Sequence, residues 1–178
     1  AMPDCTKETY YNFPWNADYI KLCRVVIGDG ITRIGSYAFY DMNGAFSLKI
    51  GSAVEEIGEY AFGYTYVTKV NIPSNVKRIE SYAFAWSDLR EVSFAEGLEE
   101  IGDYAFYAGE NRLGAAPVVR LPASLKSVQG RSFAWVRAFE VAEGSESYTA
   151  VDGVLYSRDM TSLISFPKQR EQTVYRIP

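Results

Sequence analysis

Hydrophobic and polar residues alternate in short stretches that return at regular intervals along the chain. In the stretch VTKVNIP, residues 67–73, Val70 and Ile72 alternate with Lys69 and Asn71. This is the period of a strand with one buried face. Pro73 then stops the ladder, because proline has no backbone N–H to donate. The pattern predicts a short strand that ends at this proline.

The residues after this proline predict two further pieces of the same unit. SNVKRI, residues 74–79, indicates a turn and a second short extended piece, with Val76 and Ile79 facing inward. ESYAFAWS, residues 80–87, has local helical character and predicts short helical turns. Ala83 and Phe84 are expected in the core, because a small residue before a large one suits a tight bend filled by one ring.

The same phrase recurs five times, as IGSYAF, IGEYAF, IESYAF, IGDYAF and a degenerate VQGRSF. The last gap is longer because GENRLGAAP, residues 109–117, contains an insertion. Phenylalanines end the phrases at intervals of 23, 22, 22 and 27 residues: Phe39, Phe62, Phe84, Phe106 and Phe133. A period near 22 residues lies within the range of leucine-rich repeats.

A repeat of this length cannot bury its apolar face alone, whereas stacked repeats can. We therefore expect an α/β repeat fold, a right-handed solenoid of five to six repeats with a parallel β-sheet and short helical turns. The five phrase phenylalanines form the expected structural core, and each buried ring stabilises the fold by about 1.5–3 kcal/mol. In each repeated strand, the positions that alternate with the buried ones should face solvent. Together they should form a sheet face of mixed charge: Arg24, Val26, Ser47, Lys49, Lys69, Asn71, Glu91, Ser93, Val118, Arg120, Ala138 and Glu140.

The two ends of the chain depart from the period, as the ends of a solenoid must when they cover an exposed core. Residues 1–22 are aromatic-rich and are expected to form an N-terminal cap. Residues 23–142 hold the leucine-rich repeats, and residues 143–178 are expected to form a variant C-terminal repeat or hairpin. We expect one continuous solenoid domain.

Composition narrows the possible chemistry. The chain has no histidine, which removes histidine-based acid–base and nucleophilic catalysis and most zinc sites. A net charge of −4 does not indicate a basic surface for nucleic-acid binding or a polybasic membrane anchor. No apolar stretch is long enough for a membrane span. We expect no cofactor and no metal.

Two cysteines, Cys5 and Cys23, leave two alternatives open. A disulfide between them would stabilise the fold by roughly 3 kcal/mol in an oxidising compartment. The other interpretation is two unpaired thiols, with Cys23 in a strand.

The combination of an apolar strand, a proline and V/L-x-x-I-G-x-Y-A-F resembles the BspA-type, or Treponema pallidum-type, leucine-rich repeat over about residues 12–178. This resemblance implies a bacterial protein that is secreted or attached to the cell surface, with any signal peptide removed. It also implies adhesion and protein–protein contact, including contact with host matrix proteins, and it brings no catalytic residues. One departure is that Tyr64, Trp86 and Trp135 stand where the family often has a small or polar residue.

Two surfaces are candidate binding sites for a protein or a glycan. An aromatic series follows the repeated phrase: Tyr40, Tyr64, Trp86, Tyr107 and Trp135. Exposed aromatic rings are typical of binding hot spots, although these rings could equally fold back onto the turns. The second surface is the strand face with Lys49, Lys69, Glu91 and Arg120, which could equally be a solvated sheet face. The insertion is either a binding loop or neutral.

Acidic pairs such as Glu55–Glu56 and Glu99–Glu100 fall at equivalent repeat positions, which favours repeat surface over catalysis or calcium binding. The sequence thus predicts a non-catalytic surface module for protein–protein interaction or adhesion. The alternative is a structural spacer that holds another domain away from the cell. An enzyme would need a pocket with convergent polar groups.

Overall fold

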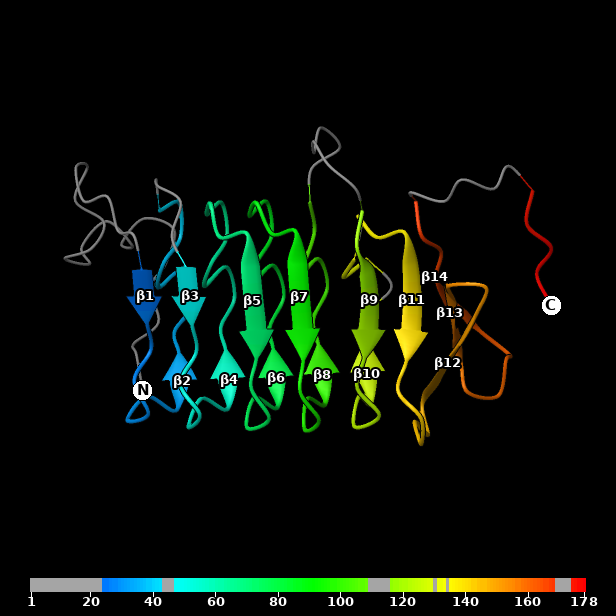
Figure 1. Ribbon diagram of the computed structural model, residues 1–178, viewed down its shortest axis with the longest axis horizontal. Coiled ribbons are helices and arrows are strands. Elements are labelled where there is room, and N and C mark those ends of the chain that lie inside the picture. Colours follow the sequence, from blue (N-terminus) through cyan, green and yellow to red (C-terminus); the bar gives the residue numbers. More distant parts are fainter. Residues whose placement is uncertain (1–23, 43–46, 109–115, 130, 134, 169–173) are drawn as a thin grey trace.

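Two rows of short parallel strands run along the molecule, one in front of the other (Figure 1). The computed structural model describes residues 24–42, 47–108, 116–129, 131–133, 135–168 and 174–178. Each repeat places one strand in the first row and a two-residue strand in the second row. The chain therefore winds as a solenoid of about five turns, with the core between the two rows.

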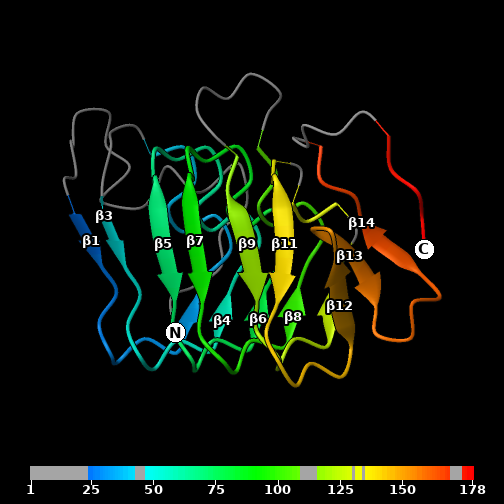
Figure 2. The ribbon, with the colours of Figure 1, turned by 45° about the vertical axis from the view of Figure 1, so that its right-hand side comes forward.

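The first row consists of three parallel pairs that lie side by side (Figure 2). Strand β1 pairs with β3, β5 with β7, and β9 with β11. Buried residues alternate with exposed ones in β1, β5 and β9, and the inward positions of β3 and β7 are half-buried, so the sequence pattern predicts the inward face of these strands. The strands are β1 (Arg24–Val26), β3 (Ser47–Lys49), β5 (Lys69–Ile72), β7 (Glu91–Phe94), β9 (Val118–Leu121) and β11 (Ala138–Val141).

The second row is one five-stranded parallel sheet in the order β10-β8-β6-β4-β2. In each of these strands the second residue is buried, which is the inward position predicted for Ile79 and its equivalents. The strands are β2 (Arg33–Ile34), β4 (Glu56–Ile57), β6 (Arg78–Ile79), β8 (Glu100–Ile101) and β10 (Ser127–Val128).

Three antiparallel strands follow the parallel rows: β12 (Tyr148–Val151), β13 (Val154–Ser157) and β14 (Leu163–Ser165). Their sheet continues the stack: the N–H of Phe139 in β11 donates to the carbonyl of Gly153 at 2.8 Å, and the N–H of Val128 in β10 donates to the Tyr148 hydroxyl at 2.9 Å. It lies within the segment for which the sequence predicts a variant C-terminal unit. The predicted N-terminal cap and both cysteines, Cys5 and Cys23, lie outside the described residues, as does most of the insertion.

The repeated phenylalanines form a continuous stack through the interior. Successive ring centroids are 5.1, 5.1, 5.3 and 5.1 Å apart from Phe39 to Phe133, and no pair of ring planes is inclined by more than 11°. All five side chains are buried. The core of each repeat that carries the phrase is therefore filled by the same aromatic side chain.

The predicted short helical turns are not confirmed, because the described residues contain no helix. The reason lies in where the backbone N–H groups of the YAF phrase donate. Phe62 donates to Ala83 at 2.7 Å, and Phe84 donates to Ala105 at 2.8 Å, so each phrase bonds to the next repeat. The phrase tyrosines also have left-handed φ angles of 53–60°, which stop a right-handed helix.

We expect Phe84→Ala to destabilise the protein by about 3–5 kcal/mol, because it leaves a cavity in the middle of the phenylalanine stack. Urea unfolding followed by circular dichroism measures this loss. Val26→Ala is the matched control, since Val26 is exposed on the first row and its loss should change stability by no more than about 0.5 kcal/mol. Equal effects of the two substitutions would contradict the proposed importance of the stack.

Candidate functional site: an aromatic patch

Four of the five aromatic residues predicted as a series lie in contact with one another. Ring centroids are 5.4 Å apart for Tyr40 and Tyr64, 5.0 Å for Tyr64 and Trp86, and 5.3 Å for Trp86 and Tyr107. Tyr64 and Trp86 are 41% and 37% exposed, whereas Tyr40 is only 8% exposed. The exposed part of the series is therefore centred on Tyr64 and Trp86.

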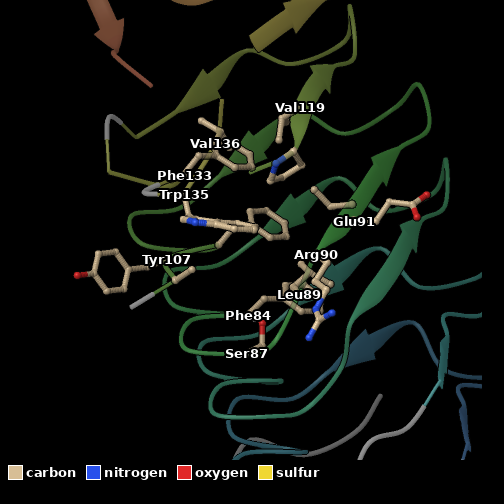
Figure 3. Close-up of a pocket in the computed structure, with 14 residues that line it drawn as sticks. Phe84, Ser87, Leu89, Arg90, Glu91, Tyr107, Val119, Phe133, Trp135 and Val136 are labelled. Atoms are coloured by element: carbon tan, nitrogen blue, oxygen red, sulfur yellow. Dashed lines mark hydrogen bonds between the residues drawn. The ribbon is translucent and has the colours of Figure 1, made fainter. Parts of the chain in front are cut away.

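Trp135 lies apart from these rings. It is 8% exposed and lines a small apolar cavity of about 30 Å³ between the repeats. Figure 3 shows its indole among the cavity residues, next to Phe133, while the Tyr107 ring points away. The cavity has room for little more than one water molecule. Of the predicted aromatic series, Trp135 is thus the member that packs inward.

A second row of rings, missed by the sequence analysis, runs beside the first. It consists of the tyrosines of the YAF phrase: Tyr37, Tyr60, Tyr82 and Tyr104. Their centroids are 5.1, 4.8 and 5.1 Å apart, with nearly parallel planes. Trp86 stacks in parallel against both Tyr60 and Tyr82, at 6.5 and 6.0 Å, and so joins the two rows.

We call the combined surface the aromatic patch, and it comprises Tyr37, Tyr40, Tyr60, Tyr64, Tyr82, Trp86, Tyr104 and Tyr107. The sequence does carry a signal for the second row, since tyrosine holds the same place in four phrases. The sequence analysis treated that phrase as core throughout. The left-handed tyrosine instead directs its ring to the half-buried surface, while the Ala and Phe that follow turn inward.

The backbone holds Tyr64 and Trp86 in the left-handed region, with φ angles of 57° and 54°. Their N–H groups donate to the carbonyls of Ala85 and Tyr107 in the next repeat, at 2.9 and 2.7 Å. A residue with a Cβ atom in this conformation costs about 1–2 kcal/mol. The turn would therefore be more stable with glycine at either position, and both rings are exposed despite that cost.

Four polar groups at the centre of the patch are available to a ligand. Within the described part of the chain, the hydroxyls of Tyr60, Tyr64 and Tyr82 and the indole N–H of Trp86 make no hydrogen bond. Burial, followed by the neighbouring tyrosines and Glu59, raises the pKa of Tyr60 to about 12. The phenol thus stays neutral at physiological pH and can both donate and accept.

Arg131 continues the row of phrase tyrosines at its far end. In the degenerate phrase VQGRSF, it occupies the position that tyrosine holds in the other four copies. Its guanidinium carbon lies 4.5 Å from the Tyr104 ring centroid, and its Nη2 lies 2.9 Å from Asp103 Oδ2. Nη1 also donates to the Tyr104 hydroxyl. The patch therefore already holds one guanidinium group.

The predicted strand face is exposed, but its centre is paired internally. Lys69 and Glu91 form an ion pair at 2.6 Å, and the Ser93 hydroxyl donates to Asn71 at 2.7 Å. An ion pair this exposed contributes little to stability. Lys49 and Arg120 are exposed on either side of this pair, on β3 and β9. The face has no concentrated charge.

The second row of strands carries alternating charges in exact register across the sheet. Arg33 Nε lies 2.6 Å from Glu56, and Arg78 lies 3.1 Å from Glu56 and 2.9 Å from Glu100. Burial alone would raise the pKa of Glu56, but the hydrogen bond and the charge of Arg33, helped by Arg78, hold it below its usual value. This surface thus neutralises its own charge.

Glu80 lies beside this row of charges, but its pKa is shifted in the opposite direction from that of Glu56. Burial, and then its hydrogen bond with Glu56, raise the pKa of the Glu80 carboxyl. Its Oε2 accepts a hydrogen bond from the backbone N–H of Glu59 at 2.9 Å. The proton on this carboxyl is therefore bound more tightly in the folded chain than in the unfolded chain.

The described surface has two further hollows. Two open polar grooves of about 430 and 440 Å³ lie over β6 and β8 and beside β11. No group of three or more potential metal ligands occurs among the described residues. In the same ranges, no helix has the length and apolar character needed to cross a membrane.

Comparison with known proteins identifies the family. The family model described as "BspA type Leucine rich repeat region" matches residues 16–140, in six copies. The chain belongs to this family of leucine-rich repeat proteins. Among curated proteins, none matches the chain.

Solved structures of bacterial proteins share the fold. A leucine-rich repeat protein from Eubacterium ventriosum ATCC 27560 is 29% identical with a TM-score of 0.87, over 99% of this chain and 46% of its own. The pneumococcal vaccine antigen PcpA is 27% identical with a TM-score of 0.76, over 88% and 39%. A leucine-rich cell surface protein from Faecalibacterium prausnitzii A2-165 is 26% identical with a TM-score of 0.62, over 92% and 50%. The chain thus spans half or less of the length of each of these proteins.

We expect Trp86→Gly to be more stable than Trp86→Ala by about 1 kcal/mol. Both variants lose the same ring stacking, but only glycine adopts the left-handed φ angle without a steric cost. Urea unfolding of both variants and the wild type measures the difference. An alanine variant as stable as the glycine variant would show that the turn at Trp86 is not strained.

We expect Glu80→Gln to be at least as stable as the wild type at pH 7, with the advantage shrinking as the pH falls toward the ordinary value of 4.5 for this carboxyl. A raised pKa in the folded state means that the contribution of Glu80 to stability is present at low pH and is lost as the pH rises. Glutamine keeps both hydrogen bonds without the charge. Urea midpoints at several pH values measure this.

Glu56→Gln is the matched control for this experiment. The pKa of Glu56 is lowered, so its contribution is present at neutral pH and is lost as the pH falls. This variant should therefore be destabilised at pH 7, with the difference from the wild type shrinking in acid. If both variants differed from the wild type with the same sign at pH 7, the opposite roles of the two carboxyls would be refuted.

Proposed function

We propose that this chain is a non-catalytic binding module of a secreted or surface-attached bacterial protein, and that it mediates protein–protein contact or adhesion through the aromatic patch. The observation that carries the proposal is the exposure of Tyr64 and Trp86 at left-handed turn positions. The backbone conformation alone favours glycine at both positions. Binding gives a reason for the aromatic residues there.

The chemistry of the patch supports this proposal. Tyrosine and tryptophan supply large contact areas with few rotatable bonds, so ordering them on binding costs little entropy. The parallel stacking of Trp86 against three tyrosines fixes these rings before a partner arrives. Such prearranged aromatic rings are the usual energetic centres of protein interfaces.

The relatives support a surface location. One is described as a pneumococcal vaccine antigen and another as a leucine-rich cell surface protein. Host matrix proteins are therefore the first partners to screen, with glycans as a second class. The strand face around Lys49 and Arg120 is the other candidate surface, because solenoid faces are broad and rigid. A spacer that holds another domain away from the cell is the competing role.

A direct binding screen tests the proposal. Purified extracellular-matrix proteins and a glycan panel are presented to the wild type, to Trp86→Gly, and to a strand-face variant with Lys49→Ala and Arg120→Ala. We expect Trp86→Gly to reduce the affinity for a matrix protein at least about tenfold, as expected for a hot-spot residue. The strand-face variant should keep its affinity. A chain that binds no member of either panel would favour the spacer role.

A further inference from the structure

We infer that the aromatic patch recognises a protein segment that carries arginine or lysine side chains. This inference rests on the proposed function, because it assumes that the patch is the binding site and adds the chemistry of its partner. Three observations carry it: the charge around the patch, the way its rings are presented, and the arginine that it already holds.

The acidic residues adjacent to the patch outnumber Arg131, the basic residue that contacts it. Every charged residue that is next in sequence to a patch residue is an acid, and these residues are Asp41, Glu59 and Asp103. Asp103 already pairs with Arg131. Glu59 is exposed and close enough to Tyr60 to help raise the pKa of its phenol. A rim of this sign attracts cationic partners and repels acidic ones.

The repeat places Asp41 next to the patch, in line with Tyr64 and Trp86. It stands two residues after its phrase phenylalanine, which is the position of Tyr64 and Trp86 in the next two repeats. Its φ angle of 54° is in the same left-handed region, and its N–H donates to the carbonyl of Gly63 at 2.9 Å. A carboxylate therefore precedes the two exposed rings in the same column of the solenoid.

The orientation of the rings distinguishes between classes of ligand. Tyr60 and Tyr82 stack at 4.8 Å with an interplanar angle of 1°, and Tyr64 and Trp86 stack at 5.0 Å and 16°. Stacked rings cover one another's faces and present their edges, where the hydroxyls and the indole N–H lie. Sugars and nucleobases stack on open ring faces, so this arrangement does not suit them. Hydrogen bonding at the ring edges remains open to a partner.

Arg131 shows how a cationic side chain fits this surface. Its guanidinium lies over the face of the Tyr104 ring, the last in the row, and bonds the Tyr104 hydroxyl and the carboxylate of the residue before that tyrosine. Glu59 and Tyr60 repeat the same acid–tyrosine pair two units earlier. Tyr60 is stacked on both sides, so a guanidinium from a partner would bond there at the ring edge. Planar guanidinium groups are well suited to carboxylates and phenol oxygens together.

The test is a selection of displayed random peptides on the folded chain, followed by affinity measurements with the selected peptides. We expect the selected peptides to be rich in arginine and lysine. Their affinity should fall at least about tenfold for Trp86→Gly. It should also fall for the double variant Asp41→Asn, Glu59→Gln, which removes two charges while asparagine tolerates the left-handed turn. Replacing the arginines of a selected peptide with glutamine should abolish binding.

Other outcomes would overturn the inference in distinguishable ways. Peptides that need Trp86 but carry no excess of basic residues, or a glycan that binds at Trp86, would refute the partner chemistry and leave the patch as the binding site. Binding that survives Trp86→Gly but is lost with Lys49→Ala and Arg120→Ala would refute the patch and leave a binding module. A chain that selects no peptide and binds no matrix protein would refute both proposals.

Discussion

Backbone hydrogen bonds between successive repeats set the one spacing on which every other feature of this solenoid depends. They hold neighbouring repeats at about the strand separation of 4.7–4.9 Å. Any residue type that recurs at the same repeat position therefore becomes a column with contacts at that interval. The phenylalanine stack, the tyrosine row and the charged ladder are three results of this constraint, and they differ only in the side chain that is repeated.

Each column accommodates the spacing in the way its chemistry allows. Aromatic rings stack at this separation, so the same residue can recur in every repeat, as in Phe39 to Phe133. Like charges repel at this separation, and the sequence accordingly alternates Arg33, Glu56, Arg78 and Glu100. Where the tyrosine row ends, a planar cation takes the place of the next ring. The degenerate phrase VQGRSF thus preserves the contact while changing the residue.

Much of the fold could be predicted from the sequence, because period-2 alternation and a repeat of 22 residues both report directly on buried positions. The inward placement of Ile79, Ala83 and Phe84 follows from that pattern. The absence of the expected helical turns from the described residues could not be predicted in the same way. A YAF phrase looks helical by itself, but its phenylalanine N–H bonds to the next repeat, as Phe62 does to Ala83. This competing hydrogen bond can be identified only in the three-dimensional structure.

The candidate site was predictable in part. Tyr64 and Trp86 stand out because they replace small residues, and both are exposed. Trp135 occupies the equivalent sequence position yet packs inward, into a cavity that Ala108 and Pro117 also line. The phrase tyrosines were assigned to the core with their neighbours, because sequence periodicity does not report the sign of a φ angle. That sign directs the Tyr60 and Tyr82 rings to the surface.

The left-handed turn that follows the first three phrases has a consequence for how such a protein can diversify. The backbone conformation there is held by hydrogen bonds to the next repeat, and Asp41, Tyr64 and Trp86 all adopt it despite their different side chains. The identity of the residue is thus uncoupled from the geometry that displays it. Each of these three repeats offers one externally facing position that mutation can change without altering the core, so a lineage could change what it recognises one repeat at a time while keeping the same scaffold.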